Sequence, residues 1–161
     1  MPITFSGNEL INIAIDIEQR GIAFYDIMAK STESAEVRDI FQYLTDMERT
    51  HIDIFEGMLG ETDKYQIPET YAEEYSTYLQ ALVDNAVFTD DAITSEMATR
   101  ASSDIEALEL AIGAEKDSIL FYYEMKEILP QQAQPMVTKI IAEEKSHLRE
   151  ISELKKKLAA A

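Results

Sequence analysis

Four long segments with the periodicity of amphipathic helices constrain the fold of this chain more than any other feature. Apolar residues recur in them three, four and seven positions apart, which places these residues on one face of a helix. The predicted helices span about 6–30, 35–59, 103–129 and 131–158. Short links at 31–34 and at Pro130 join the first two and the last two helices, so each pair is expected to form an antiparallel hairpin.

The stretch between the two hairpins, about 61–102, lacks a sustained period. It contains Pro68, several tyrosines and one short helix, predicted at about 71–85. A connection of this length allows the third long helix to begin at the end of the molecule opposite to where the second one stops. We therefore expect an all-α fold, an antiparallel four-helix bundle with a long crossover between its second and third helices.

Helix ends carry recognisable capping signals. Ser6 and Glu9 are expected to form a capping box at the start of the first helix, and Ser103 and Glu106 at the start of the third. Gly60 suits the position just after the second helix, where a left-handed backbone is common.

Composition and length narrow the class of protein. With 46% hydrophobic residues, the 161 residues can bury one core, so we expect a single domain over 1–161. The absence of cysteine excludes disulfides, iron–sulfur clusters and thiolate zinc sites. A net charge of -17 argues against nucleic acid as a partner, because lysine and arginine contact its phosphates. The chain has no long apolar run and no leader pattern, so we expect a cytoplasmic protein without a membrane partner.

The two hairpins also resemble each other in sequence. Residues 14–25 align with 111–122 at a shift of 97, and residues 48–51 align with 144–147 at a shift of 96. Self-similarity at a fixed spacing is the mark of an internal repeat. The chain is therefore expected to contain one helical hairpin twice.

Each of the four helical stripes carries a glutamate in its apolar middle. These residues are Glu18, Glu48, Glu115 and Glu144. Burial of an uncompensated carboxylate is costly, and four of them at one level should repel one another and raise their pKa values. The nearest lysines and arginines lie one or two positions along each helix and point off the stripe. Metal cations are the remaining compensation, and two divalent ions balance four carboxylates.

The two histidines of the chain support a metal site. His51 and His147 each follow a stripe glutamate by three residues, in matching positions of the repeat. A lone buried histidine is more often a hydrogen-bonded core residue than a ligand. Two Glu-x-x-His motifs facing two further helices with one glutamate each are the ligand pattern of di-iron carboxylate bundles. The predicted metal ligands are Glu18, Glu48, His51, Glu115, Glu144 and His147.

Two tyrosines lie on the same helical faces. Tyr25 and Tyr122 follow Glu18 and Glu115 by seven residues, or two turns. Their hydroxyls are expected to donate to ligating carboxylates and fix the orientation of these groups. The alternative is that both are amphipathic core aromatics whose hydroxyls find any partner.

These motifs resemble the rubrerythrin branch of the ferritin-like superfamily. The matching stretches are 18–25, 46–51, 114–122 and 142–147, one on each predicted helix. The resemblance implies a ferritin-like bundle that binds two iron ions through the six residues named above. Manganese or zinc would also suit a site of carboxylates and imidazoles.

The sequence departs from the typical rubrerythrin pattern in two ways. Without cysteines the chain cannot form the rubredoxin domain of typical members, so the resemblance implies a separate electron donor, rubredoxin-like or other. Typical members also have a glutamate at the position of Ser118, and in the family that glutamate takes part in an iron movement linked to peroxide reduction. Its absence leaves a symmetric ligand set closer to that of bacterioferritin.

The resemblance implies a di-iron oxidoreductase that reduces hydrogen peroxide or dioxygen in protection against oxidative stress, as a homodimer or small homo-oligomer. The small residues Gly21 and Ser118 on the ligand face either leave room for the oxidant or allow close helix packing. The alternative function is ferroxidase activity with iron storage or buffering, which would need a closed hollow assembly. A purely structural bundle is disfavoured, because leucine at the four glutamate positions would be less costly.

Overall fold

The computed structural model describes residues 5–60, 69–88 and 90–161, without the side chains of 69–72, 91–93 and 100. Six helices and no strands occur in these ranges, which confirms the all-α prediction. The helices are α1 (Gly7–Ser31), α2 (Ala35–Met58), α3 (Glu69–Asp84), α4 (Asp91–Arg100), α5 (Asp104–Ile128) and α6 (Gln134–Ala160).

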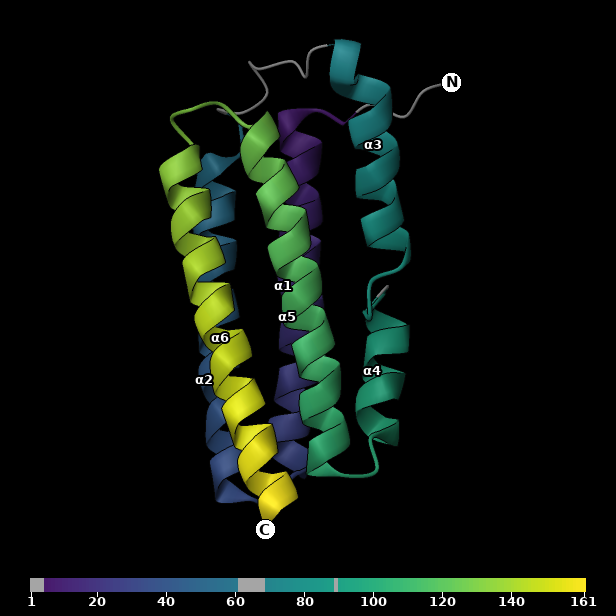
Figure 1. Ribbon diagram of the computed structural model, residues 1–161, viewed down its shortest axis with the longest axis vertical. Coiled ribbons are helices and arrows are strands. Elements are labelled where there is room, and N and C mark those ends of the chain that lie inside the picture. Colours follow the sequence, from purple (N-terminus) through teal and green to yellow (C-terminus); the bar gives the residue numbers. More distant parts are fainter. Residues whose placement is uncertain (1–4, 61–68, 89) are drawn as a thin grey trace.

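The four long helices run side by side as a bundle (Figure 1). Helix α1 packs against α2 and α5 packs against α6, while contacts of α1 with α5 and of α2 with α6 join the two hairpins. The end of α2 and the start of α5 lie at opposite ends of the bundle, and α3 and α4 follow one another along its side (Figure 1). The predicted topology with one long crossover is therefore confirmed.

The described part of the crossover contains two helices, whereas the sequence indicated one. Helix α3 covers most of the predicted 71–85 segment, and α4 was missed. Helix α4 packs along α1, and its buried positions include Thr94 and Ala98, one turn apart. A small polar residue and an alanine give too weak an apolar stripe for periodicity to predict a helix. The helical structure of this segment therefore depends on its packing against α1.

The predicted capping signals are largely present. Ser6 and Ser103 each accept a hydrogen bond through Oγ from the backbone N–H three residues on, at 3.1 Å in both cases. The Glu106 carboxylate bonds to the backbone N–H of Ser102 at 3.0 Å rather than to that of Ser103. Gly60 has a φ of 88°, in the left-handed region expected of a residue that follows a helix.

The predicted start of the last helix was three residues too early. Residues 131–133 form a turn in which the Ala133 N–H donates to the Pro130 carbonyl at 2.9 Å, and α6 begins at Gln134. A proline followed by a tight turn delays the helix, which periodicity alone does not reveal.

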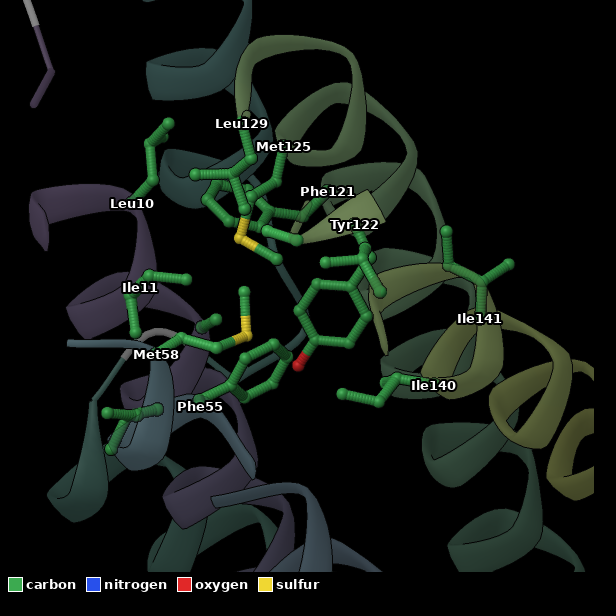
Figure 2. Packing of buried hydrophobic residues seen from close by; sticks show 14 of the residues in the cluster. Leu10, Ile11, Phe55, Met58, Phe121, Tyr122, Met125, Leu129, Ile140 and Ile141 are labelled. Atoms are coloured by element: carbon green, nitrogen blue, oxygen red, sulfur yellow. The ribbon is translucent and has the colours of Figure 1, made fainter. Parts of the chain in front are cut away.

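The apolar core consists of two clusters separated by a polar layer. On α1 the buried residues of the first cluster end at Ile15 and those of the second begin at Phe24, with Glu18 between them. A buried glutamate also separates the two clusters on each of the other three bundle helices. In the first cluster the Tyr122 ring packs beside Phe55, with ring centroids 5.4 Å apart (Figure 2). Burial of one large apolar side chain contributes about 1.5–3 kcal/mol. Packing on both sides therefore holds the polar layer in a rigid frame.

Candidate metal centre

The polar layer brings together all six residues that the sequence predicted to be metal ligands. Helix α1 contributes Glu18, α2 contributes Glu48 and His51, α5 contributes Glu115, and α6 contributes Glu144 and His147. All six side chains are buried, and none of these residues is more than 3% exposed. The arrangement follows from the sequence, because each residue occupies the middle of an inward-facing stripe.

The six side chains form two overlapping groups of four. In each group one ligand atom per residue lies within 4.8 Å of the others. The first group is Glu18, Glu48, His51 and Glu144, and the second is Glu48, Glu115, Glu144 and His147. Glu48 and Glu144 belong to both groups, so their carboxylates occupy the positions that bridging ligands would need.

Both imidazole rings direct Nδ1 toward the carboxylates. His51 Nδ1 lies 3.0 Å from Glu144 Oε1, 3.3 Å from Glu48 Oε2 and 3.5 Å from Glu18 Oε1. His147 Nδ1 lies 3.2 Å from Glu144 Oε2 and 3.8 Å from Glu115 Oε2. A neutral imidazole with its lone pair on Nδ1 could therefore complete either group of ligands.

Burial and mutual repulsion act on the carboxylates when no cation is bound. Burial raises the pKa of Glu48 well above its ordinary value, and the neighbouring carboxylates Glu144 and Glu18 raise it further. Burial likewise raises the pKa of Glu144, with Glu115 as the next contributor. Glu18 is an exception to the predicted rise. Burial favours its neutral form, but hydrogen bonds with Glu48 and His51 outweigh burial and lower its pKa.

The histidines supply positive charge to the metal-free cluster. Burial alone lowers the pKa of His51, but hydrogen bonds to Glu144 and Glu18 more than reverse this effect and raise the pKa well above its usual value. For His147, the nearby carboxylates of Glu115 and Glu144 outweigh burial and raise the pKa to about 10. Bound protons thus partly offset the negative charge that a cation would balance.

One carboxylate oxygen tests whether the residues fit a metal ion. Glu115 Oε2 is buried and has no hydrogen-bond partner among the described residues, since His147 Nδ1 lies 3.8 Å away. An unsatisfied buried polar group costs roughly 1–3 kcal/mol, and more when it is charged. Carboxylate oxygens and imidazole nitrogens are ligands that iron and related divalent metals accept. The cluster therefore fits a metal centre.

The two tyrosines bond to carboxylates in a crossed arrangement. The Tyr25 hydroxyl on α1 donates to Glu115 Oε1 on α5 at 2.7 Å, and the Tyr122 hydroxyl on α5 donates to Glu18 Oε1 on α1. Each tyrosine lies two turns, or about 10 Å, along the helix from the glutamate of its own helix. Its hydroxyl therefore bonds to the glutamate of the antiparallel neighbouring helix instead. Burial, followed by the nearby carboxylates, raises the pKa of both tyrosines, so both remain hydrogen-bond donors.

A small cavity adjoins the cluster. Its lining includes Glu18, Glu48 and Glu115, with the small residues Gly21 and Ser118 beside them. The crossover covers it with residues that sequence analysis did not single out: Leu82, Val83, Ala86 and Phe88. The space open to the centres of water molecules is about 30 Å³, and one water needs roughly 10–15 Å³. A molecule the size of hydrogen peroxide or dioxygen fits there.

Gly21 lines this cavity and does not lie where two helices pack closely together. A Cβ at Gly21 would lie 3.6 Å from Tyr25 Cε2 and 3.8 Å from Glu48 Cγ, both ordinary contacts with side chains of the site. The Ser118 hydroxyl turns to its own helix and donates to the Ala114 carbonyl at 3.1 Å. Between the two interpretations of these small residues, the structure thus favours room beside the cluster.

Sequence analysis missed two residues that contact the histidines. Glu143 Oε2 lies 2.8 Å from His51 Nε2, and the Tyr43 ring packs edge-on against His147 with centroids 5.8 Å apart. Both residues lie off the apolar stripes and are partly or fully exposed. The only available signal was that Glu143 adjoins Glu144, which does not distinguish it from the many other surface carboxylates.

The fold and the carboxylate–histidine cluster define a ferritin-like helical bundle of the di-iron carboxylate type. A family model described as Rubrerythrin matches residues 9–155, and the chain belongs to this family. A similar solved structure is that of a protein from Thermotoga maritima, described as a ferritin-like diiron-carboxylate protein. It is 30% identical with a TM-score of 0.69, over 97% of this chain and 98% of that one. No curated protein matched. Within the described ranges, no helix has the length and apolar character needed to cross a membrane.

Proposed function

We propose that the six clustered side chains bind two iron ions and that this centre reduces hydrogen peroxide or dioxygen with electrons from an external donor. The main support is the pair of overlapping ligand groups that share Glu48 and Glu144. Four carboxylates balance the charge of two divalent ions, and each group offers one imidazole nitrogen. Manganese or zinc would occupy the same ligands.

The chemistry needs two electrons at one place. Reduction of one hydrogen peroxide to two water molecules consumes two electrons and two protons, and a ferrous pair, when bound, supplies both electrons. The protein's own residues hold the geometry for this step. The hydroxyls of Tyr25 and Tyr122 fix one carboxylate each, and the cavity beside Gly21 and Ser118 admits a small oxidant next to Glu18, Glu48 and Glu115.

Ferroxidase activity with iron storage or buffering is the second candidate. The observation that favours it is Ser118, because the serine side chain bonds to its own helix and adds no further ligand to the symmetric set. A storage protein would assemble into a closed hollow shell. A reductase of the proposed kind is expected to be a homodimer or small homo-oligomer, so the mass in solution separates the two functions.

The central experiment is anaerobic loading with ferrous iron followed by stopped-flow oxidation. Hydrogen peroxide and dioxygen are mixed with the loaded protein separately. A much faster reaction with peroxide supports the reductase, comparable rates support the ferroxidase, and no oxidation by either overturns both. The identity of the electron donor, rubredoxin-like or other, and a cytoplasmic location stay predictions.

A further inference from the structure

The two imidazole rings of the cluster are held in different ways at Nε2, the nitrogen that points away from the carboxylates. His51 Nε2 lies 2.8 Å from Glu143 Oε2, and the Glu143 side chain is 27% exposed. His147 Nε2 is buried and has no hydrogen-bond partner among the described residues. The Tyr43 ring, on a residue that is 45% exposed, packs edge-on beside the His147 ring and offers it no such bond.

The internal repeat explains this difference. Glu143 comes directly before Glu144, and the residue directly before Glu48 is Met47. At a shift of 96, the first hairpin therefore has a thioether where the second has a carboxylate. The six clustered ligand residues follow the repeat, but the residue that bonds to the outer edge of His51 has no equivalent for His147.

We infer that Glu143 is a positioning residue that makes the two ion sites unequal, with the site at Glu18 and His51 the tighter one. The inference rests on the proposed two-ion centre. If Nε2–H donates to Glu143, the lone pair lies on Nδ1 and the ring is aimed at the shared carboxylates. A carboxylate bonded to the outer N–H of a ligating histidine also strengthens the ligand, and loss of such a partner typically costs about 10–100-fold in metal affinity.

The His147 site lacks both advantages. Its buried N–H is unpaired, so the tautomer with a free Nδ1 is penalised by an unsatisfied donor. The first ion is therefore expected to enter beside His51, and the ion beside His147 is expected to bind second and exchange faster. The two ions are thus expected to bind in order because of a single carboxylate, that of Glu143, although the two sets of ligands are symmetric.

The test measures zinc affinity, because zinc is redox-silent and no turnover is involved. Metal-free protein competes with a chelator for zinc in two backgrounds, His147→Ala, which retains the His51 site, and His51→Ala, which retains the other. Glu143→Ala is expected to weaken binding about 10–100-fold in the first background and by less than about 2-fold in the second. Glu143→Gln should fall between, because an amide oxygen still accepts the hydrogen bond.

Glu150→Gln is the matched control. Glu150 is an exposed carboxylate on the same helix, and the change removes the same charge without touching His51. It should leave affinity unchanged in both backgrounds. Equal weakening by Glu143→Ala in both backgrounds, or no weakening in either, would overturn the inference while leaving the two-ion centre intact. Failure of the unaltered protein to bind zinc would instead overturn the proposed centre.

A second measurement does not depend on the histidine variants. In the zinc-loaded protein, the imidazole N–H of His51 should give a slowly exchanging NMR signal that Glu143→Ala abolishes and Glu150→Gln retains. Persistence of that signal in Glu143→Ala would also overturn the inference.

Discussion

The α1–α2 and α5–α6 hairpins present nearly the same inner face to the centre of the bundle but different outer faces. Each hairpin contributes two glutamates, one histidine and one tyrosine that bonds to a glutamate of the other hairpin. On the outer side, α5 has Gly113 and Asp117. The positions of α1 that match them in the repeat hold Asp16 and Arg20. The inner faces agree because both must serve one symmetric cluster.

The outer faces differ because the crossover docks on them differently. The Val87 N–H donates to Asp117 Oδ2 at 2.8 Å, and a Cβ at Gly113 would lie only 2.8 Å from Val87 Cγ2. At the matching positions of α1, Asp16 has a Cβ and Arg20 has no carboxylate that could accept such a bond. A repeated hairpin thus retains its symmetry where chemistry requires it and departs from it where the rest of the chain must pack.

The largest expected effect tests the symmetry of the inner faces. Glu48→Gln and Glu144→Gln alter the carboxylates shared by both groups, one from each hairpin, and each should reduce binding from about two ions per chain to below about one. Glu18→Gln and Glu115→Gln should each retain about one ion, because each residue serves one group only. Metal analysis after anaerobic ferrous loading measures this. Equal losses in all four variants would contradict the shared-ligand arrangement.

The next largest expected effect is that bound metal reverses the direction in which stability changes with pH. In the metal-free protein the pKa values of His51, Glu48 and Glu144 are raised, and that of His147 is raised from 6.5 to about 10. A group with a raised folded pKa stabilises the native state below its unfolded pKa and loses that contribution as pH rises through the folded pKa. The His147 contribution should therefore be complete below about pH 6.5 and lost by about pH 10.

Glu18 acts in the opposite sense, since its pKa is lowered and its contribution is lost only on acidification through its folded pKa. Metal-free protein should thus melt at a higher temperature near pH 6.5 than near pH 10. With zinc bound, acidification should destabilise the fold, because protons compete for the ligands. Thermal melts of the metal-free and zinc-bound forms across this pH range test whether the pH dependence reverses. A pH response in the same direction for both forms would show that the six residues do not share one buried metal site.

A smaller effect sharpens the comparison of the outer faces. Gly113→Ala inserts a methyl group against Val87, whereas Gly57→Ala on α2 meets nothing within 4 Å. Overpacking costs about 1–3 kcal/mol, and both changes gain up to about 1 kcal/mol of helix propensity. Gly113→Ala should therefore be less stable than Gly57→Ala by about 1–3 kcal/mol in chemical unfolding. Equal stabilities would show that Val87 moves aside without cost.

The smallest effect concerns the crossed tyrosines. Tyr25→Phe removes the hydrogen bond to Glu115, and Tyr122→Phe removes the hydrogen bond to Glu18. Each change should slow oxidation of the ferrous protein more than it weakens metal binding, because the carboxylate remains but loses its orientation. Stopped-flow rates and binding titrations on the same variants separate the two effects. Unchanged kinetics would reduce the tyrosines to packing residues.

Local patterns in the sequence determined most of the fold and the inner faces. Helical periodicity defines the four bundle helices, since the spacing of apolar residues along one helix does not depend on the rest of the chain. The same spacing places Glu18, Glu48, Glu115 and Glu144 on the inward stripes. The long crossover followed from its length, because a short link cannot bring α5 to the opposite end of the bundle.

Only the tertiary structure decided which side chain of another helix each residue of the site contacts. The bond between Glu143 and His51, the crossed tyrosine bonds and the lowered pKa of Glu18 depend on how each helix is rotated against its neighbour. Helix α4 likewise forms on the surface of α1, with little apolar pattern of its own. Sequence spacing determines which face of a helix a residue occupies, and packing between helices determines which partner that face meets.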